Sequence, residues 1–365
     1  MKRNPFKFGS VVDGRHFTNR YNEIDRLKEV LNSDNNLTII SPRRYGKTSL
    51  VLNVLNNANR PFILLDMQMI TSEKDLATQL LKRLYRIYPF ERIKRYIKNF
   101  RFVPIISVNP VSNAVDIAFG AESKADPILE DVLNTMDQLS SSRKKLIVIF
   151  DEFQDVISLH DNILKKLRAI MQHHKKINYI FLGSQESMIR QIFENKKSPF
   201  YHFGLTLQLE KIPQSDFYKY LRERFRSMCS KPSELSKQIL EISQCHPYYT
   251  QQLAYACFEQ IRNRPEAKDI VDVAVKELVR MHDMDYERIW ASFNNTDKKL
   301  LIGLSHSDLG PLSEAFALKY NTGASSTVYS SLKRLMNAGY IVKNSAKYEL
   351  EDPFFKIWLN KRREQ

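Results

Sequence analysis

The order of apolar and polar residues predicts alternating strands and helices in the first part of the chain. Four short runs are continuously apolar, which is typical of strands buried on both faces of a parallel sheet. These runs are residues 37–41, 62–66, 146–151 and 179–184. Helical patterns lie between them, at residues 49–57, 73–88 and 162–173. The alternation predicts a three-layer α/β fold with a parallel sheet and right-handed crossovers.

Residues 102–119 depart from this alternation. Two alternating runs flank Asn109 and Pro110, and a helical pattern follows at 127–139. The arrangement predicts a β-hairpin inserted into the core. The hairpin either extends the edge of the sheet, which we favour, or forms a surface hairpin that contacts a partner.

Beyond residue 213 the patterns are mainly helical. The first four helical patterns are at 215–228, 233–243, 248–262 and 271–293. Prolines lie near the starts of these helices, and the group predicts a helical subdomain. Three further helical patterns and two short β-rich runs predict a winged helix-turn-helix; they are at 297–304, 311–319, 325–338, 340–343 and 347–350. The predicted domains are therefore a core at 1–210, a helical subdomain at 211–294 and a winged helix at 295–365.

A phosphate-binding loop lies where the first predicted strand meets a helix. The segment from Ser41 to Thr48 reads Ser-Pro-Arg-Arg-Tyr-Gly-Lys-Thr, and its position is the one that a P-loop requires. Backbone N–H groups and the helix N-terminus would hold phosphate, and Lys47 would reach the β- and γ-phosphates. The hydroxyl of Thr48 would bind Mg²⁺. The predicted phosphate-binding residues are Ser41, Pro42, Arg43, Arg44, Tyr45, Gly46, Lys47, Thr48 and Ser49.

A pair of carboxylates ends the third apolar run. Asp151 and Glu152 follow residues 146–150, at the strand end where ligands of open α/β sheets bind. Asp151 would hold Mg²⁺ through water, and Glu152 would polarise the attacking water as general base. Together with the P-loop, the pair predicts hydrolysis of ATP to ADP and phosphate.

Composition and charge indicate which partners and which compartment to expect. The 365-residue chain has a formal net charge of +15, and a basic protein attracts polyanions such as nucleic acid through its long-range field. Its apolar runs are shorter than the roughly 18 residues of a membrane span, and the N-terminus lacks the apolar core of a secretory signal. The 3 cysteines show no metal-binding or redox spacing, so we expect reduced thiols in a cytoplasmic protein without membrane contact.

Several of these segments resemble the AAA+-like STAND ATPases, specifically the predominantly archaeal ATPase family that also has bacterial members. The segments similar to that family are Phe17-Thr18-Asn19-Arg20 with Glu23-Ile24, the P-loop, Asp-Glu-Phe-Gln at 151–154, and Asp-Pro-Phe-Phe-Lys-Ile-Trp-Leu at 352–359. The resemblance runs nearly end to end. It implies a P-loop NTPase core, a helical lid over the nucleotide and a C-terminal winged helix, with ATP and Mg²⁺ as cofactors.

The resemblance also implies roles for further residues. Ser184, in Gly183-Ser184-Gln185, corresponds to a position that hydrogen-bonds the γ-phosphate or the lytic water. Residues that would border the adenine are Val11, Val12, Phe17, Arg20, His246 and Pro247. Ordinary strand packing is the alternative for Val11, Val12 and Phe17, and a capping or core role is the alternative for His246. Cys245 stands where the lid turn of the family has glycine.

The resemblance is incomplete at the arginine that stabilises transition-state charge in several relatives. Residues 201–204 read Tyr-His-Phe-Gly, without that arginine. Arg43, Arg44 or Arg190 would have to replace it, and the sequence does not choose among them. Because such an arginine contributes on the order of 10³-fold in rate, we expect slow turnover.

Two regions are candidates for nucleic-acid contact. The second helix of a helix-turn-helix lies in the major groove, so we assign DNA contacts to this helix and the wing: Ser326, Tyr329, Lys333, Arg334, Lys343 and Lys347. The alternative is a winged helix that packs on the ATPase core. Basic and aromatic residues interleave between 82 and 101; a solvated helix face is the interpretation that we favour over nucleic-acid contact.

The sequence thus leaves three functions open. The first is an ATP-hydrolysing switch with ATP and Mg²⁺ between core and lid, acting on DNA or on an unknown protein client. The second is a winged-helix DNA-binding regulator in which the nucleotide is structural. The third is an AAA+-type loader that works as a homo-oligomer.

Overall fold

The computed structural model describes residues 3–108, 115–120, 125–184, 186–264, 269–344 and 347–363. They form two compact units. The sheet unit comprises Tyr21–Ser41 and Lys47–Leu209. The winged-helix unit comprises Met1–Arg20, Pro42–Gly46 and Glu210–Gln365. The tip of the P-loop is therefore grouped with the C-terminal half of the chain.

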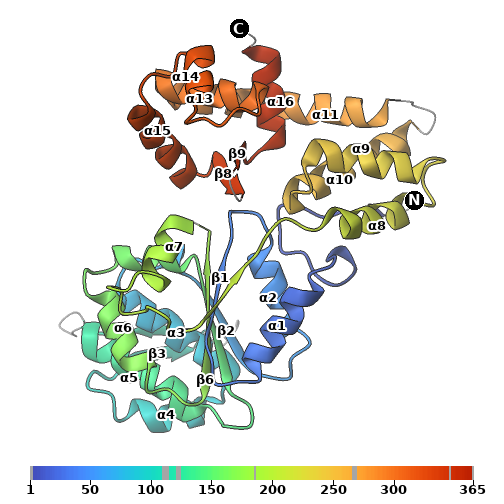
Figure 1. The fold of residues 1–365 in the computed structure, drawn as a ribbon. Coiled ribbons are helices and arrows are strands. Elements are labelled where there is room, and N and C mark those ends of the chain that lie inside the picture. Colours follow the sequence, from blue (N-terminus) through green and yellow to red (C-terminus); the bar gives the residue numbers. More distant parts are fainter. Residues whose placement is uncertain are drawn as a thin grey trace. The chain divides into compact units, whose positions relative to one another are not determined.

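A five-stranded sheet in the order β2-β5-β6-β1-β7 is the centre of the sheet unit (Figure 1). All its strand pairs are parallel, which confirms the predicted parallel α/β sheet. Its strands are β1 Leu37–Ile40, β2 Phe62–Asp66, β5 Leu146–Asp151, β6 Ile177–Gly183 and β7 Leu205–Gln208. Strand β7 was not predicted, because most of its side chains are exposed and its pairing with β1 is made by the backbone.

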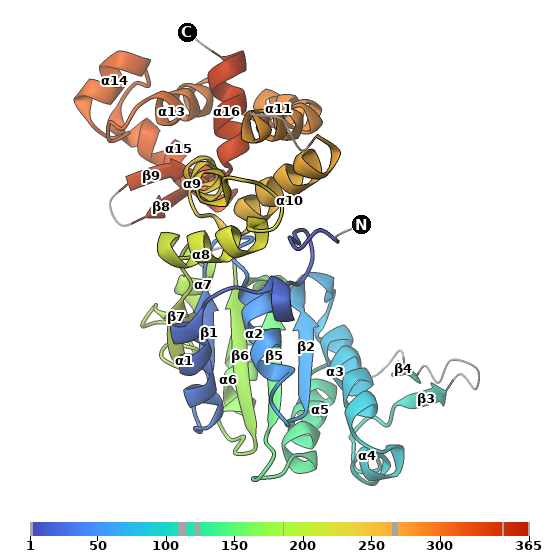
Figure 2. The ribbon, with the colours of Figure 1, turned by 90° about the vertical axis from the view of Figure 1, so that its right-hand side faces the viewer.

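Helices cover both faces of this sheet, as the three-layer prediction requires. Figures 1 and 2 show α1 and α2 on one face and α3, α5, α6 and α7 on the other. Their bounds are α1 Tyr21–Leu31, α2 Lys47–Leu55, α3 Glu73–Ile87, α5 Ala125–Leu139, α6 Ile163–Met171 and α7 Glu186–Phe193. Helix α4, Phe90–Ile97, packs against α3 and α5. Short 3-10 helices are η2 Met67–Met69 and η3 Phe153–Ser158.

An aromatic cluster supports the end of β5. The Phe153 ring lies 4.6 Å from the Phe181 ring and 5.5 Å from the Phe200 ring, measured between centroids. All three side chains are fully buried. A close-packed interior leaves little room for displacement. This cluster therefore holds in place the end of β5, which Glu152 follows, and the end of β6, which Ser184 follows.

The predicted hairpin is a separate two-stranded sheet. Strands β3 Ile105–Val108 and β4 Val115–Ala118 pair antiparallel, which confirms the strand pairing. The preferred placement at the sheet edge is wrong: the pair is not hydrogen-bonded to the main sheet and instead contacts α3 through β4 (Figure 2). The buried Ile117 makes this packing favourable. Asn109 and Pro110 lie outside the described residues.

The winged-helix unit contains the predicted helical subdomain and winged helix. The former has α8 Gln214–Phe225, α9 Pro232–Ser243, α10 Pro247–Asn263, α11 Ile270–Met281 and α12 Asp283–Ser292. The latter has α13 Asn295–His306, α14 Glu314–Tyr320, α15 Ser325–Asn337, β8 Ile341–Asn344, β9 Lys347–Leu350 and α16 Pro353–Arg362. The predicted helix at 271–293 is wrong in one respect, because it breaks at His282 into α11 and α12.

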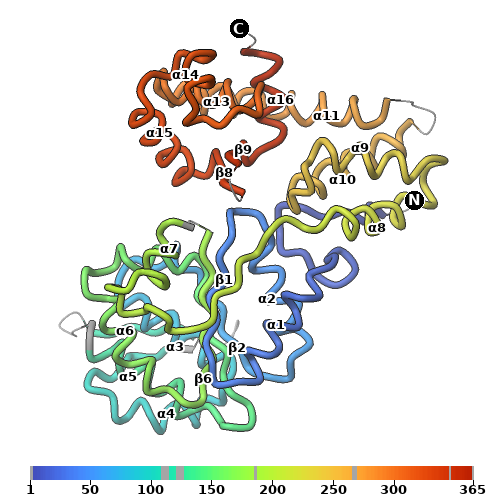
Figure 3. Tube along the Cα trace, in the orientation of Figure 1, coloured from blue at the N-terminus to red at the C-terminus, as the bar shows by residue number. Residues whose placement is uncertain are grey.

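One hydrophobic cluster joins the two parts of this unit. It extends from Phe6 in the N-terminal arm through α8–α11 to Leu359 in α16. The arm also includes a 3-10 helix, η1 Gly14–His16, and its trace begins beside α8–α10 in Figure 3. The winged helix therefore packs on the helices of the predicted lid through a continuous core. In the described part of the chain, no helix is both long and apolar enough to span a membrane.

The first prediction concerns Gly183, the last residue of β6. An ideal Cβ at this position would lie 2.7 Å from Cγ1 and 2.8 Å from Cβ of Ile189, which is fully buried in α7. Gly183→Ala should lower the free energy of unfolding by about 1–3 kcal/mol, because neither element can yield without repacking. Urea denaturation measures this change. Gly310→Ala is the control, since a Cβ there meets no described heavy atom within 4 Å; an equal loss in both variants would contradict the steric explanation.

Candidate nucleotide-binding site

The order of the strands brings the predicted catalytic segments to one edge of the sheet. Strand β6 lies between β1 and β5, and all of them run in the same direction. The carboxyl ends of neighbouring parallel strands meet at the same edge. Ser41 after β1, Ser184 after β6 and the Asp151–Glu152 pair at the end of β5 are therefore neighbours in space.

Lys47 is held at the beginning of α2. Its ammonium donates hydrogen bonds to the carbonyl oxygen of Ser41 at 3.2 Å and to its hydroxyl at 3.3 Å. The side chain is only 6% exposed. Ser41 occupies the position of the first glycine in the usual P-loop pattern, and here its small side chain supplies an acceptor for the lysine.

Thr48 and Asp151 join the P-loop helix to β5. The Thr48 hydroxyl donates to Oδ2 of Asp151 at 2.6 Å, and the Glu152 backbone N–H donates to Oδ1 at 3.0 Å. Burial raises the pKa of the Asp151 carboxyl, although the Thr48 hydrogen bond opposes the rise. A hydroxyl beside a carboxylate is a ligand set that suits Mg²⁺, which binds oxygen ligands. The two residues predicted to hold Mg²⁺ are therefore in contact.

The loop backbone is left-handed at Gly46, immediately before the helix that follows the loop. Gly46 has φ +89°, and an ideal Cβ on it would meet no heavy atom of the described residues within 4 Å. Helix α2 begins at the next residue, Lys47, so its positive N-terminal end follows the loop directly. These features fit the phosphates of a nucleotide.

Glu152 is held by a small network of donors. Its backbone is left-handed, with φ 50° and ψ 46°, a conformation that costs a non-glycine residue free energy. Its Oε2 accepts from the Ser184 hydroxyl at 2.6 Å, the Ser184 N–H at 3.1 Å and the Gln154 side-chain amide at 2.7 Å. Ser184, predicted to contact phosphate or water, thus contacts the proposed base. Gln154 was not selected from the sequence, although it lies in the quoted Asp-Glu-Phe-Gln segment; Gln185 lies outside the described residues.

The tip of the P-loop contacts other residues of the winged-helix unit, to which it belongs. The Arg44 guanidinium lies 4.5 Å from the Tyr248 ring centroid and donates to the Tyr249 hydroxyl at 3.2 Å. Arg20 is 3% exposed and donates to the carbonyl oxygen of Tyr45 at 3.3 Å and to that of Glu210 at 2.6 Å. Arg20 therefore anchors the loop tip to the segment that enters α8.

His246 caps a helix, which is the alternative role considered for it above. Its Nδ1 accepts from the N–H groups of Tyr248 and Tyr249 at the start of α10. Its ring also meets the Tyr45 ring edge-on at 4.9 Å between centroids. Of the other adenine candidates, Val11 is exposed, Val12, Phe17 and Pro247 are half-buried, and their assignment to an adenine pocket stays a prediction.

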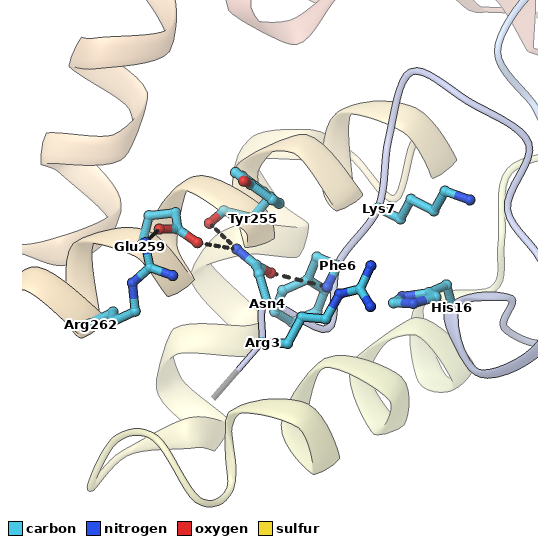
Figure 4. Close-up of a pocket in the computed structure, with 8 residues that line it drawn as sticks. All are labelled: Arg3, Asn4, Phe6, Lys7, His16, Tyr255, Glu259 and Arg262. Atoms are coloured by element: carbon cyan, nitrogen blue, oxygen red, sulfur yellow. Dashed lines mark hydrogen bonds and ion pairs between the residues drawn. The ribbon is translucent and has the colours of Figure 1, made fainter. Parts of the chain in front are cut away.

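The winged-helix unit contains a pocket of about 410 Å³ between the N-terminal arm and α10 (Figure 4). Asn4 secures the arm by donating to Oε1 of Glu259 at 2.8 Å and to the carbonyl oxygen of Tyr255 at 3.2 Å. Arg3, Lys7 and Arg262 also line the pocket. None of the predicted adenine residues does. No sequence pattern indicates this pocket, because its residues are brought together only by the fold.

All six predicted DNA-contact residues are exposed, and two of them also form ion pairs. Ser326, Tyr329 and Lys333 are exposed on α15, and Lys343 is exposed on β8 beside the Tyr348 ring. Lys347 pairs with Asp308 at 2.7 Å. Arg334 pairs with Asp297 at 2.6 Å, and that carboxylate is 3% exposed. Arg334 thus has a structural partner within the winged helix.

Most of the other charged candidates are also engaged. Arg190 pairs with Glu194 at 2.6 Å and donates to Gln208 at 2.9 Å, while Arg43 is exposed. Several residues of the basic run between 82 and 101 have protein partners: Lys82 with Asp116, Arg83 with the Leu64 carbonyl, Arg92 with the Leu139 carbonyl, and Arg101 with Glu130 and Asp131. These contacts support a structural role for much of that run.

The second prediction separates the two roles on α15. Arg334→Ala should lower the free energy of unfolding by about 1–3 kcal/mol, because it leaves the buried Asp297 carboxylate without its cation. Lys333→Ala, at an exposed neighbouring position, should change it by less than about 0.5 kcal/mol. Thermal unfolding of both variants measures the difference, and similar stabilities would show that the Asp297 pair contributes little.

Known proteins similar to this chain cover four fifths of it or more. The uncharacterized protein MJECL04 of Methanocaldococcus jannaschii is 24% identical over 312 residues, which are 81% of this chain and 59% of that relative. The chain thus spans about three fifths of the relative's length. Among solved structures, the Walker-type ATPase PABY2304 of Pyrococcus abyssi has a TM-score of 0.68 and 18% identity, with 96% of this chain and 97% of that chain covered.

Two structures from Aeropyrum pernix share the fold at lower similarity. ORC2 in ADPNP–ADP complexes has a TM-score of 0.56 and 14% identity, covering 98% of each chain. ORC1 in complex with DNA has a TM-score of 0.51 and 12% identity, covering 95% of this chain and 93% of that chain.

Family models match both parts of the sequence. Residues 284–361 match a family described as a probable winged helix domain. Residues 17–253, more than half of the chain, match the family described as the ATPase domain predominantly from Archaea. The protein belongs to this family of ATPase domains and has a winged helix domain at its C-terminal side.

Proposed function

We propose that the protein is an ATP-dependent switch that hydrolyses ATP slowly, with Mg²⁺, and acts on duplex DNA. The observation that carries the proposal is the set of contacts at the sheet edge. Lys47 with Ser41, Thr48 with Asp151, and Ser184 with Glu152 are each joined by hydrogen bonds of 3.3 Å or less. These residues supply a cation for phosphate, oxygen ligands for Mg²⁺ and a base for water.

Each residue has a distinct role in this proposal. The Lys47 ammonium binds the β- and γ-phosphates, while Thr48 and Asp151 hold Mg²⁺. Bound Mg²⁺ supplies positive charge that offsets the charge of the phosphates. Glu152 accepts a proton from the attacking water.

Two features support slow hydrolysis. Oε2 of Glu152 already accepts three hydrogen bonds, so proton transfer requires its other oxygen or a rearrangement of this network. In addition, residues 201–204 contain no arginine that could stabilise transition-state charge. A site with these features is better suited to a nucleotide-dependent switch than to a fast motor.

The winged helix supports action on DNA. Lys333 and Tyr329 are exposed on α15, the second helix of the predicted helix-turn-helix pair, and the chain has a net charge of +15. The A. pernix ORC1 protein, which shares the fold, was solved in complex with DNA. The same observations favour, as the second candidate, a DNA-binding regulator in which the nucleotide is only structural.

The third prediction tests the nucleotide chemistry. Lys47→Ala should abolish ATP binding, because the buried site loses its cation, and Glu152→Gln should bind ATP but not hydrolyse it. Isothermal titration calorimetry with ATP and Mg²⁺ measures binding, and phosphate release with and without duplex DNA measures turnover. Normal turnover by Glu152→Gln would exclude this residue as the base. Salt-sensitive DNA binding that is indifferent to nucleotide would favour the second candidate.

The fourth prediction tests the DNA surface. Lys333→Ala and Lys343→Ala should each weaken duplex binding regardless of sequence and reduce the salt slope of log K by about 1. Fluorescence anisotropy with labelled duplexes at several salt concentrations measures both quantities. Lys196→Ala, which removes an exposed lysine of the sheet unit, is the control. An unchanged slope in both winged-helix variants would place the DNA contact elsewhere.

A third possibility, an oligomeric loader, makes a different prediction about mass. Light scattering with ATP present would show a homo-oligomer in that case, and a strict monomer would count against it.

A further inference from the structure

Glu351 links the winged helix to the helical lid. It lies between β9 and α16, with a side chain 10% exposed. Its Oε2 accepts from the Tyr249 hydroxyl at 3.1 Å, and its Oε1 lies 3.0 Å from Nε2 of His246. Two oxygens of one carboxylate are thus used by two residues at the start of α10.

The cap at α10 determines which nitrogen of His246 carries the proton. Nδ1 accepts the backbone N–H groups of Tyr248 and Tyr249, at 3.2 and 3.4 Å, so it has no proton of its own. Nε2 therefore donates to Glu351. The side chain of His246 is 2% exposed, and with both nitrogens engaged its ring has one orientation.

The same hydroxyl that contacts Glu351 also contacts the P-loop. Arg44 donates to the Tyr249 oxygen at 3.2 Å, while the Tyr249 hydroxyl proton is donated to Glu351. The chain of hydrogen bonds runs from a P-loop cation through a neutral hydroxyl to a winged-helix carboxylate. Charged ends strengthen such a chain, because each bond polarises the next.

Glu351 is also adjacent to the cap of α16. Asp352 accepts from the N–H groups of Phe354 at 2.8 Å and Phe355 at 3.2 Å, and from the Tyr286 hydroxyl at 3.0 Å. Trp358, one of only two tryptophans in the chain, lies on α16 and is 1% exposed. A shift of Glu351 would therefore move the first turn of the helix that carries Trp358.

We propose that Glu351 is a positioning residue that couples phosphate binding at the P-loop to the winged helix, through Tyr249 and His246. A phosphate group near the loop tip attracts the Arg44 guanidinium and competes with Tyr249 and Glu351 for it. The inference rests on the proposed function, because it requires a nucleotide at the P-loop. It assigns the regulation of that site to a residue outside the ATPase family match, which ends at residue 253.

Tryptophan fluorescence tests the coupling, because both tryptophans belong to the winged-helix unit and their rings lie 6.4 Å apart. Saturating Mg²⁺–ATPγS should change the emission of the wild-type protein. Glu351→Gln keeps the size of the side chain and removes its charge; we expect it to bind ATPγS within about tenfold of the wild-type affinity and to lose the emission change at saturation. Calorimetry measures the binding independently.

Two further variants distinguish coupling from a general loss of structure. Glu314→Gln removes an exposed carboxylate from α14 of the same winged helix and should keep the full emission response. Tyr249→Phe removes only the shared hydroxyl and should reproduce the Glu351→Gln result, even if the latter variant folds poorly. Thermal unfolding midpoints establish that each variant is folded.

A double-mutant cycle provides the quantitative test. If Arg44 and Glu351 act through one chain of contacts, the effects of Arg44→Ala and Glu351→Gln on ATPγS affinity should be non-additive by about threefold or more. Additive effects, or a full emission response in folded Glu351→Gln, would overturn this inference and leave the proposed function unaffected. Absence of nucleotide binding by the wild-type protein would overturn the proposed function and this inference together.

Discussion

A buried lysine is the constraint around which the candidate site is arranged. Lys47 is 6% exposed, and a charged group removed from water is costly unless hydrogen bonds and opposite charge compensate for the loss of hydration. Ser41 supplies two acceptors. Burial raises the pKa of the nearby Asp151, and the charge of Lys47 opposes this rise. A phosphate group would provide further compensation, so this arrangement favours an anionic ligand more strongly than an exposed lysine would.

The sequence predicted those parts of the fold that depend on local pattern. The runs that became β1, β2, β5 and β6 were recognised because they combine β-forming residues with an apolar pattern in short segments. The small β7 was missed because most of its side chains are exposed. The break at His282 was also missed. There the carboxylate of Asp283 accepts from the Trp358 indole at 2.7 Å, a contact between residues far apart in the chain that no local pattern reveals.

The same distinction applies to the site. Lys47, Thr48 and Asp151 could be selected because a P-loop and a strand end have recognisable surroundings. His246 was selected through the family resemblance and Arg334 through its place on the second helix of the predicted helix-turn-helix. The structure shows partners within the fold for both: Asp297 for the arginine and the start of α10 for the histidine. Gln154 and Glu351 were not selected. The contact of Gln154 with Glu152 is local and lay within the quoted segment, whereas the contacts of Glu351 with His246 and Tyr249 join residues more than 100 positions apart.

The contacts of Glu351 also limit how strongly a nucleotide could influence the winged helix. A ligand shifts an equilibrium only by the difference between its affinities for the two states. Hydrogen bonds to charged groups contribute about 1.5–3 kcal/mol each, and about 1.4 kcal/mol corresponds to a tenfold change in an equilibrium constant. Loss of the bond between Tyr249 and Glu351 could therefore change the balance between two arrangements by about 10- to 100-fold. This range is sufficient for a switch that biases DNA binding, and it falls short of the roughly 10⁴-fold needed to convert one arrangement almost completely into another.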